Sequence, residues 1–292
     1  GSGRVRRRAA DAAAHLALLL LASVTLAPVA WMVAAAFKHR GDILPADGRL
    51  ASLFVPPGDG AFGRAWDRFT LENFRALFER LDLGTALVNS VFFAGASAIL
   101  TTLVAAAAGY ALARVRFAGR GLVFGLVVAG LIVPGPLLLA PTFALLDTLG
   151  MLNSYAGLIA PGLASAFGVF LFRQATLQAV PRELVEAATI DGCGEARAFF
   201  AIALPLLRPM VGAFVIVSYL AAWNNFIAPQ IVIQDDRLFP LTVAVANLRG
   251  SYSDDYGLVM AGTLVAVVPV AVVFLMLQRD FVSGMLSGSV KG

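Results

Sequence analysis

The sequence has little charge and few of the residues that hold metals or form disulfides. Only 14% of its 292 residues are charged and 59% are hydrophobic, with a mean hydropathy of +0.83, whereas about a quarter of an average soluble domain is charged. One cysteine excludes an internal disulfide, and two histidines in unrelated segments offer no spacing typical of a metal site. The composition predicts an integral membrane protein without redox or metal chemistry.

Charge is missing altogether from six apolar runs, at about 16–37, 85–113, 122–143, 155–172, 210–233 and 257–277. Runs of about 20 residues can span a bilayer as helices. The first could be a signal peptide, because Ala34-Ala35-Ala36 imitates a cleavage site, but the run is longer than the about 7 to 15 residues of a signal-peptide core. We therefore predict an all-α membrane protein with six transmembrane helices in one domain, 16–279. It follows an N-terminal segment, 1–15, in which residues 1–3 are interpreted as a cloning remnant, and precedes a tail, 280–292.

Basic residues are concentrated in alternate loops. The N-terminus, the 114–120 loop, the 173–208 segment and the tail hold thirteen Lys and Arg against six carboxylates, and the opposite loops hold nine against twelve. By the positive-inside rule, both termini and residues 180–205 are expected in the cytoplasm. Because the basic residues are spread over loops rather than gathered with aromatics on one face, nucleic-acid binding is not indicated.

The absence of charge from the spans also indicates which energy source could drive transport by this protein. A charge at the bilayer centre costs about 2.5–3.5 kcal/mol, and ion-coupled carriers commonly keep one because it performs the coupling. The chain also has no Gly-x-x-x-x-Gly-Lys-Ser/Thr phosphate loop, so we expect it to hydrolyse no ATP itself. A transporter of this kind must either let its solute move down its concentration gradient or receive energy from another protein.

The segment 180–205 is a mostly polar island between two apolar runs. Pro181 suits the first helical position, and Gly192 suits the left-handed residue that ends a helix. Leu184, Ala187 and Ala188 share one helical face, whose small side chains allow a partner to approach closely. A second helical run, 195–204, follows the glycine. The pattern predicts a helical hairpin, and from residue types alone it could equally lie on lipid headgroups.

The spacing of this segment resembles a known family. Glu186-Ala187-Ala188, three residues, Gly192, nine residues and Ile202-Ala203-Leu204-Pro205 look like the EAA loop of the membrane subunits of bacterial ABC importers. In that family the loop is a coupling helix that docks in a cleft of the cytoplasmic ATPase. The resemblance implies that the coupling residues are Glu186, Ala187, Ala188, Asp191, Gly192, Ile202, Leu204 and Pro205. Cys193-Gly194 departs from the pattern and predicts a looser turn.

Two breaks in the spans are candidate parts of a substrate path. Pro134 and Gly135 interrupt the third span, where freed backbone groups need partners in protein or water, although a kink used only for packing is an alternative. Tyr219, Trp223, Asn224 and Asn225 form a polar and aromatic cluster in the fifth span. Aromatic faces bind sugars and amides bind polar solutes, but the amides could equally join helices. The cluster resembles the family's Trp-Asn-Asp/Glu-Phe signature, with Asn225 where an acid is often found.

The C-terminal part, with its Val-Lys-Gly end, resembles the MalG-type subunit of sugar importers. This implies one of two different permease subunits of a bacterial inner-membrane importer, with a cytoplasmic ATPase dimer and an extracytoplasmic solute-binding protein as partners. It also implies that the chain binds no cofactor, because ATP and Mg²⁺ are held by the ATPase. Composition alone predicts an unstructured Ser/Gly tail.

Two alternatives remain open. A glycerophosphate permease of the same class would need cationic groups in its path, for which Arg249 is the nearby candidate. An ion-coupled carrier or passive channel would make 180–205 a structural hairpin. The long segment 38–84 is expected to be external, either a tether or a cap whose small helix has Leu71, Phe74, Leu77 and Phe78 on one face.

Overall fold

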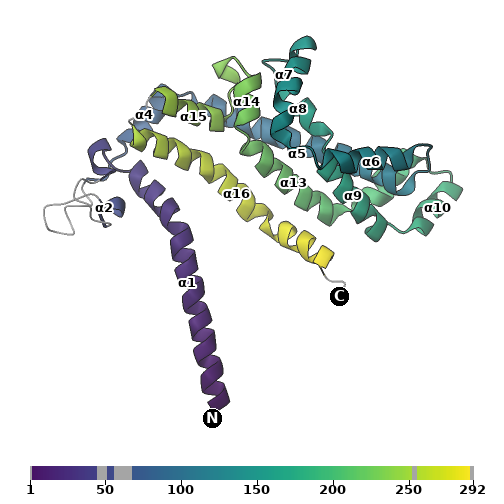
Figure 1. Ribbon diagram of the computed structural model, residues 1–292, viewed down its shortest axis with the longest axis horizontal. Coiled ribbons are helices and arrows are strands. Elements are labelled where there is room, and N and C mark those ends of the chain that lie inside the picture. Colours follow the sequence, from purple (N-terminus) through teal and green to yellow (C-terminus); the bar gives the residue numbers. More distant parts are fainter. Residues whose placement is uncertain (1, 45–50, 56–67, 252–254, 290–292) are drawn as a thin grey trace. The chain divides into compact units, whose positions relative to one another are not determined.

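The computed structural model describes residues 2–44, 51–55, 68–251 and 255–289, which form helices and one isolated β-bridge (Figure 1). Three helices are long and apolar enough to cross a membrane alone: Ala10–Ala36, Leu83–Arg114 and Tyr256–Met276. Three bent helix pairs bring the number to six when each pair is counted as one span. The all-α membrane fold is therefore confirmed, and the upper count of six agrees in number with the six predicted spans, although the third pair, Glu195–Leu206 with Arg208–Trp223, begins before the predicted run 210–233.

The bent pairs break where the sequence has helix-breaking residues. The pair α6 (Arg120–Gly130) and α7 (Leu139–Thr148) is bent by 104° around Pro134 and the short η2 (Gly135–Leu138). The pair α8 (Tyr155–Leu163) and α9 (Ala166–Ala179) is bent by 45°, with Pro161 near the break. Proline removes a backbone donor and clashes with the preceding turn, so it bends or ends helices.

Two apolar runs differ from their predicted spans. The run 210–233 is divided between α13 (Arg208–Trp223) and α14 (Ile227–Val232). Helix α9 continues beyond the predicted end at residue 172, so Arg173 lies within it, with its guanidinium carbon 3.9 Å from the centre of the Phe124 ring. The contact with the aromatic face partly offsets the free-energy cost of removing water from the guanidinium.

The chain divides into two compact units. Residues 1–82 and 245–267 form the first, which contains α1 (Ser2–Ala36), η1 (Arg40–Asp42), α2 (Ala51–Phe54) and α4 (Glu72–Arg80). Residues 83–244 and 268–292 form the second, which contains α5 to α14. Two helices have residues in both units, α15 (Leu241–Ser251) and α16 (Tyr256–Ser289). Helix α16 includes 280–289, where composition predicted an unstructured tail.

In the first unit, the described part of the 38–84 segment is attached to the end of α1. The side chain of Asn73, in α4, donates hydrogen bonds to the carbonyl oxygens of Ala36 at 2.9 Å and Lys38 at 2.8 Å. Lys38 is buried and its ammonium group donates to the Leu53 oxygen at 2.8 Å. Arg68 pairs with Asp42 at 2.8 Å. These contacts favour a folded cap over a simple tether.

The predicted apolar face of α4 is only partly buried. Leu77 is fully buried and the Phe74 ring lies 4.9 Å from that of Phe37, but Leu71 and Phe78 are 67% and 65% exposed. The buried residue that the pattern missed is Asn73, because its amide, rather than an apolar side chain, satisfies the carbonyls that end α1.

In the second unit, α5 (Leu83–Arg114) packs against α8, α9 and α13. Glycines allow these close crossings. A Cβ atom on Gly109 would lie 2.6 Å from the Arg173 backbone nitrogen, and one on Gly168 would lie 2.8 Å from the Ala105 Cβ. One apolar cluster, which includes Phe172, Val180, Phe199 and Phe214, joins α5 to α9, α13 and the segment 180–207.

A second apolar cluster contains Phe93, Leu158 and Val232. Side-chain hydrogen bonds also fix residues 232–241. Asn153, with a positive φ of 53°, accepts hydrogen bonds from the Gln234 and Asp235 backbone nitrogens at 3.0 and 2.9 Å. The Asn89 amide donates to the Arg237 and Phe239 oxygens, and the Ser90 hydroxyl accepts from the Leu241 nitrogen. These bonds hold the connection between α14 and α15.

Candidate functional site

The segment 180–205 forms a helical hairpin, whose first limb is α10 (Arg182–Ile190). Gly192 has a φ of 79°, and its N–H lies 3.1 Å from the Thr189 oxygen. The next N–H, of Cys193, bonds the Ala188 oxygen at 2.8 Å. These paired bonds around a left-handed residue form a Schellman motif. The predicted glycine stop is therefore confirmed, whereas Pro181 caps α10 from one residue before its predicted position.

Helix α10 exposes most of its surface. Val185 is its buried residue and belongs to the apolar cluster of the unit. Leu184 is 46% exposed and Ile190 86% exposed, and Glu186 and Ala187 are exposed as well. Soluble helices usually bury a whole apolar stripe. Helix α10 thus buries one residue and leaves a Leu and an Ile uncovered within the described structure.

The second limb differs from the predicted run 195–204. It comprises α11 (Glu195–Ala198), a turn of π-helix, η3 (Phe199–Ala203), and α12 (Leu204–Leu206). Pro205 has no N–H and its ring crowds the carbonyl four residues earlier, and widening the preceding turn relieves this crowding. Ile202 and Leu204 are half-buried and Pro205 is exposed. The chain then bends by 84° into α13.

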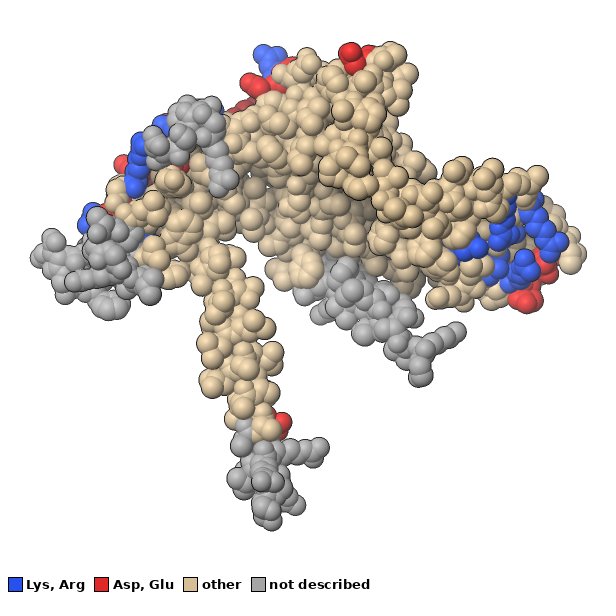
Figure 2. All heavy atoms as spheres, in the orientation of Figure 1, with Lys and Arg blue, Asp and Glu red and all other residues tan. Residues whose placement is uncertain are grey.

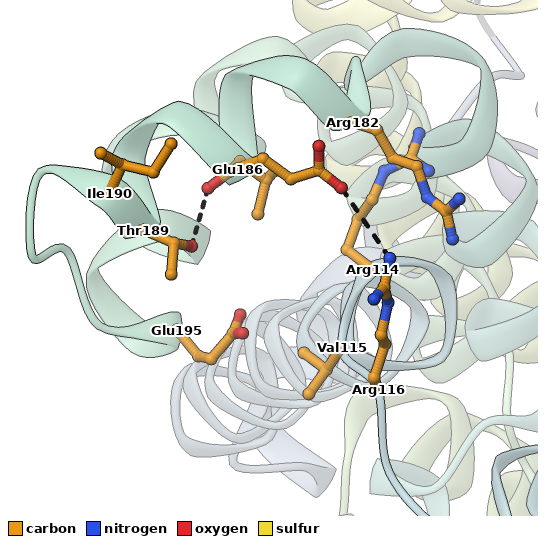
Figure 3. Close-up of a pocket in the computed structure, with 9 residues that line it drawn as sticks. Arg114, Val115, Arg116, Arg182, Glu186, Thr189, Ile190 and Glu195 are labelled. Carbon is orange, nitrogen blue, oxygen red and sulfur yellow. Dashed lines mark hydrogen bonds and ion pairs between the residues drawn. The ribbon is translucent and has the colours of Figure 1, made fainter.

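A pocket of about 490 Å³ lies between the hairpin and the end of α5 (Figure 3). The residues that line it are Arg114, Val115, Arg116, Arg182, Val185, Glu186, Thr189, Ile190 and Glu195. Figure 2 shows basic and acidic side chains gathered at this end of the unit, where Figure 1 places α10. The Arg116 and Glu186 side chains pair at 3.9 Å but are 79% and 63% exposed, so this pair contributes little stability.

Side chains of α5 contact the hairpin, and sequence reasoning did not single them out. The Tyr110 hydroxyl donates to Glu195 Oε2 at 3.3 Å. The Arg114 guanidinium donates to the oxygens of Thr176, at 3.2 Å, and Val180. Arg114 was interpreted only as part of a positive loop. Its place at the end of a long apolar run, one helical turn after Tyr110, was the available signal.

The candidate path residues lie in two places. The Tyr219 and Trp223 rings stack at 5.8 Å, as their shared helical face predicts, and Trp223 is buried. Asn224 donates to the Leu220 oxygen of its own helix at 2.8 Å, and Asn225 accepts from the Ala228 nitrogen at 3.2 Å. Both amides thus bond locally around the break after α13.

Pro134 and Gly135 form the bend between α6 and α7. Helix α13 packs against α5 and α9, whereas η2 packs against α7. Helix α14, which follows Asn225, packs against α8 and also against α7.

Six predicted spans, with an exposed glycine-capped helix in a polar loop, define a membrane subunit of a transporter. The chain belongs to the family of binding-protein-dependent transport system inner membrane components, which matches residues 98–281. It is 35% identical to the lactose transport system permease protein LacG of Rhizobium radiobacter, over 98% of each chain. It is 38% identical to the arabinooligosaccharides transport system permease protein AraQ of Halalkalibacterium halodurans, over 76% of this chain and 80% of that protein.

A solved structure supports the fold. The crystal structure of a bacterial ABC transporter involved in the import of the acidic polysaccharide alginate contains a chain that matches with a TM-score of 0.76 and 17% identity, covering 94% of this chain and 97% of that chain. The resemblance found in the sequence is thus confirmed at the level of the family. The protein is a multi-pass inner-membrane permease subunit of an ABC importer and not an enzyme.

Proposed function

We propose that this chain forms half of the translocation path of an ATP-driven sugar importer and that α10 is where a cytoplasmic ATPase docks. The observation that supports the docking is the exposure of α10: Val185 holds it to the apolar cluster, while Leu184, Ala187 and Ile190 are exposed. A coupling helix must combine these properties, because it needs a free surface for the partner and a firm attachment to the spans.

The proposed cycle assigns each part a task. A solute-binding protein delivers the sugar to the external side, and ATP binding closes the ATPase dimer. The closure displaces the hairpin and opens the path outward, and hydrolysis resets it. The docking surface consists of Glu186, Ala187, Ala188 and Asp191, with Gly192 as the stop of α10 and Ile202, Leu204 and Pro205 in the second limb. ATP and Mg²⁺ belong to the ATPase, and this chain needs no cofactor.

A sugar is the proposed solute because the two relatives above are named for lactose and for arabinooligosaccharides. Tyr219, which is half-buried and stacks on the buried Trp223, supplies an aromatic ring of the kind that binds sugars, next to the break at Asn224 and Asn225. A glycerophosphate permease remains the second candidate of this class. Its cationic candidate, Arg249, has a side chain outside the described residues.

The proposed orientation places both termini and the hairpin in the cytoplasm. Its support is the excess of arginine near the hairpin, where Arg114, Arg116 and Arg182 line one pocket. The proposed partners are a second, different permease subunit, the ATPase dimer and the solute-binding protein. The description binding-protein-dependent, which the family carries, supports the last of these.

Mass spectrometry of the complex purified from native membranes in mild detergent tests this proposal. We expect an ATPase, a second permease and a binding protein to co-purify, and calorimetry on that binding protein would then identify the sugar. Recovery of the chain alone, or only with copies of itself, would refute the proposed partners and make the hairpin structural.

A further inference from the structure

Two side chains near the end of α5 contact the chain on both sides of the hairpin turn: at the residues that lead into α10 and at the start of the second limb. Tyr110 and Arg114 are four residues apart and therefore share a helical face. Tyr110 is buried and Arg114 is half-buried. Arg114 contacts the residues that lead into α10 and Tyr110 contacts the first residue of the second limb, so one helix touches the hairpin on both sides of its turn.

Arg114 holds the entrance. Its Nη2 atom lies 3.2 Å from the Thr176 oxygen and 3.4 Å from the Leu177 oxygen, and it donates to the Val180 oxygen. The last carbonyls of a helix lack partners within the helix, and a cation there is favoured by the helix dipole. The guanidinium thus caps the C-terminal end of α9, immediately before Pro181 and α10.

Tyr110 contacts the start of the second limb. Its hydroxyl donates to Glu195 Oε2 at 3.3 Å, and Glu195 is the first residue of α11. Its ring centre lies 5.6 Å from that of Phe199, which is buried at the start of η3. The hydrogen bond and the ring contact are separable, because phenylalanine would keep the ring and lose the hydroxyl.

We propose that Tyr110 and Arg114 are a two-point anchor that passes displacement of the hairpin to α5. This inference rests on the proposed function. Helix α5 has 32 residues, about 48 Å at 1.5 Å per residue, and can carry a displacement across a bilayer. The other route out of the hairpin runs through the π-turn η3 and an 84° bend before α13. A bent segment with a widened turn deforms more easily under a displacement than the continuous helix α5, which contacts the chain on both sides of the hairpin turn.

A cysteine at the far end of α5 tests the anchor in the assembled complex. Gly84→Cys, in the exposed first turn, is combined with Cys193→Ser, which removes the native thiol. The rate of labelling by a membrane-impermeant maleimide is measured with and without Mg²⁺ and a non-hydrolysable ATP analogue, in nanodiscs with the ATPase bound. With an intact anchor, we expect the nucleotide to change the rate by about fivefold or more.

The Tyr110→Phe and Arg114→Gln variants should reduce this change to less than about twofold while the ATPase still co-purifies. Glu195→Gln keeps an acceptor for the tyrosine hydroxyl and should preserve the response, whereas Glu195→Ala should lose it. If Arg114→Gln fails to fold, Tyr110→Phe remains informative because the ring contact with Phe199 is retained.

Matched controls are Tyr155→Phe and Arg208→Gln. Within the described residues the Tyr155 hydroxyl makes no hydrogen bond and the exposed Arg208 makes no ion pair, so both should respond as the unaltered complex does. The inference would be overturned if the nucleotide changed the labelling rate fully in the Tyr110→Phe and Arg114→Gln variants. It would also be overturned if the nucleotide left the rate unchanged in the complex with both residues intact. Failure of the unaltered chain to retain any ATPase would instead refute the proposed function.

Discussion

Replacing Gly192 with aspartate perturbs the hairpin at its turn. Gly192 has a φ of 79°, and nothing lies within 4 Å of a Cβ atom built there, so the cost is backbone strain rather than a clash. An L-residue in this region costs about 1–2 kcal/mol, and aspartate is among the better tolerated. A new carboxylate at the negative end of the α10 dipole adds about 0.5 kcal/mol. At the lower end of that range the sum is about 1.5 kcal/mol; because docking requires this turn and the free hairpin can relax away from it, the affinity should fall about tenfold.

We therefore expect Gly192→Asp to raise the Kd for the ATPase about tenfold while membrane insertion stays normal. The assay is a titration of nanodisc-bound permease with purified ATPase. Gly194→Ala is the matched control, because Gly194 has a φ of −72° and also has open space around it. Its Kd should stay within about twofold, since alanine adopts this conformation without strain. Equal affinities for Gly192→Asp and Gly194→Ala would refute the reasoning.

Three further changes test other parts of the structure. Gly109→Ala should lower the stability in detergent by about 1–3 kcal/mol, because its Cβ would meet the Arg173 backbone, whereas Gly95→Ala, with open space, should not. Asn224→Leu should lower sugar uptake in proteoliposomes while the complex still assembles; lost assembly would instead indicate a structural role. Asn153→Ala removes two accepted hydrogen bonds, so hydrogen exchange should accelerate about fivefold at the 234 and 235 amides.

Local features of the chain were predictable from the sequence. The apolar runs indicated where the spans lie, because the length of a span depends on consecutive apolar residues. Gly192 indicated the end of α10, because a left-handed φ favours glycine at that position. The same reasoning detected Pro134 and Gly135 as a break but could not supply its 104° angle. That angle depends on how α6 and α7 pack, which periodicity does not encode.

The break after Trp223 depends on side-chain bonds that an apolar pattern does not reveal. Residues 210–233 form one apolar run, yet α13 ends at Trp223 because Asn225 offers its side-chain oxygen to the Ala228 nitrogen and starts α14. Asparagine competes for backbone groups in this way at helix starts. The amides were interpreted as contacts to solute or to other helices; their bonds in the described structure are local, and the contact to solute stays a prediction.

The anchor residues could not be identified from the sequence because their partners are distant in it. Arg114 and Val180 are 66 residues apart, and Tyr110 and Glu195 are 85 apart. Their meeting depends on how closely α9 crosses α5. At Gly109 the two backbones approach so closely that a Cβ atom would lie 2.6 Å from the Arg173 nitrogen. Thr176 and Leu177, one turn further along α9, then fall within reach of Arg114. A larger residue at position 109 should therefore release the hairpin as well as widen the crossing.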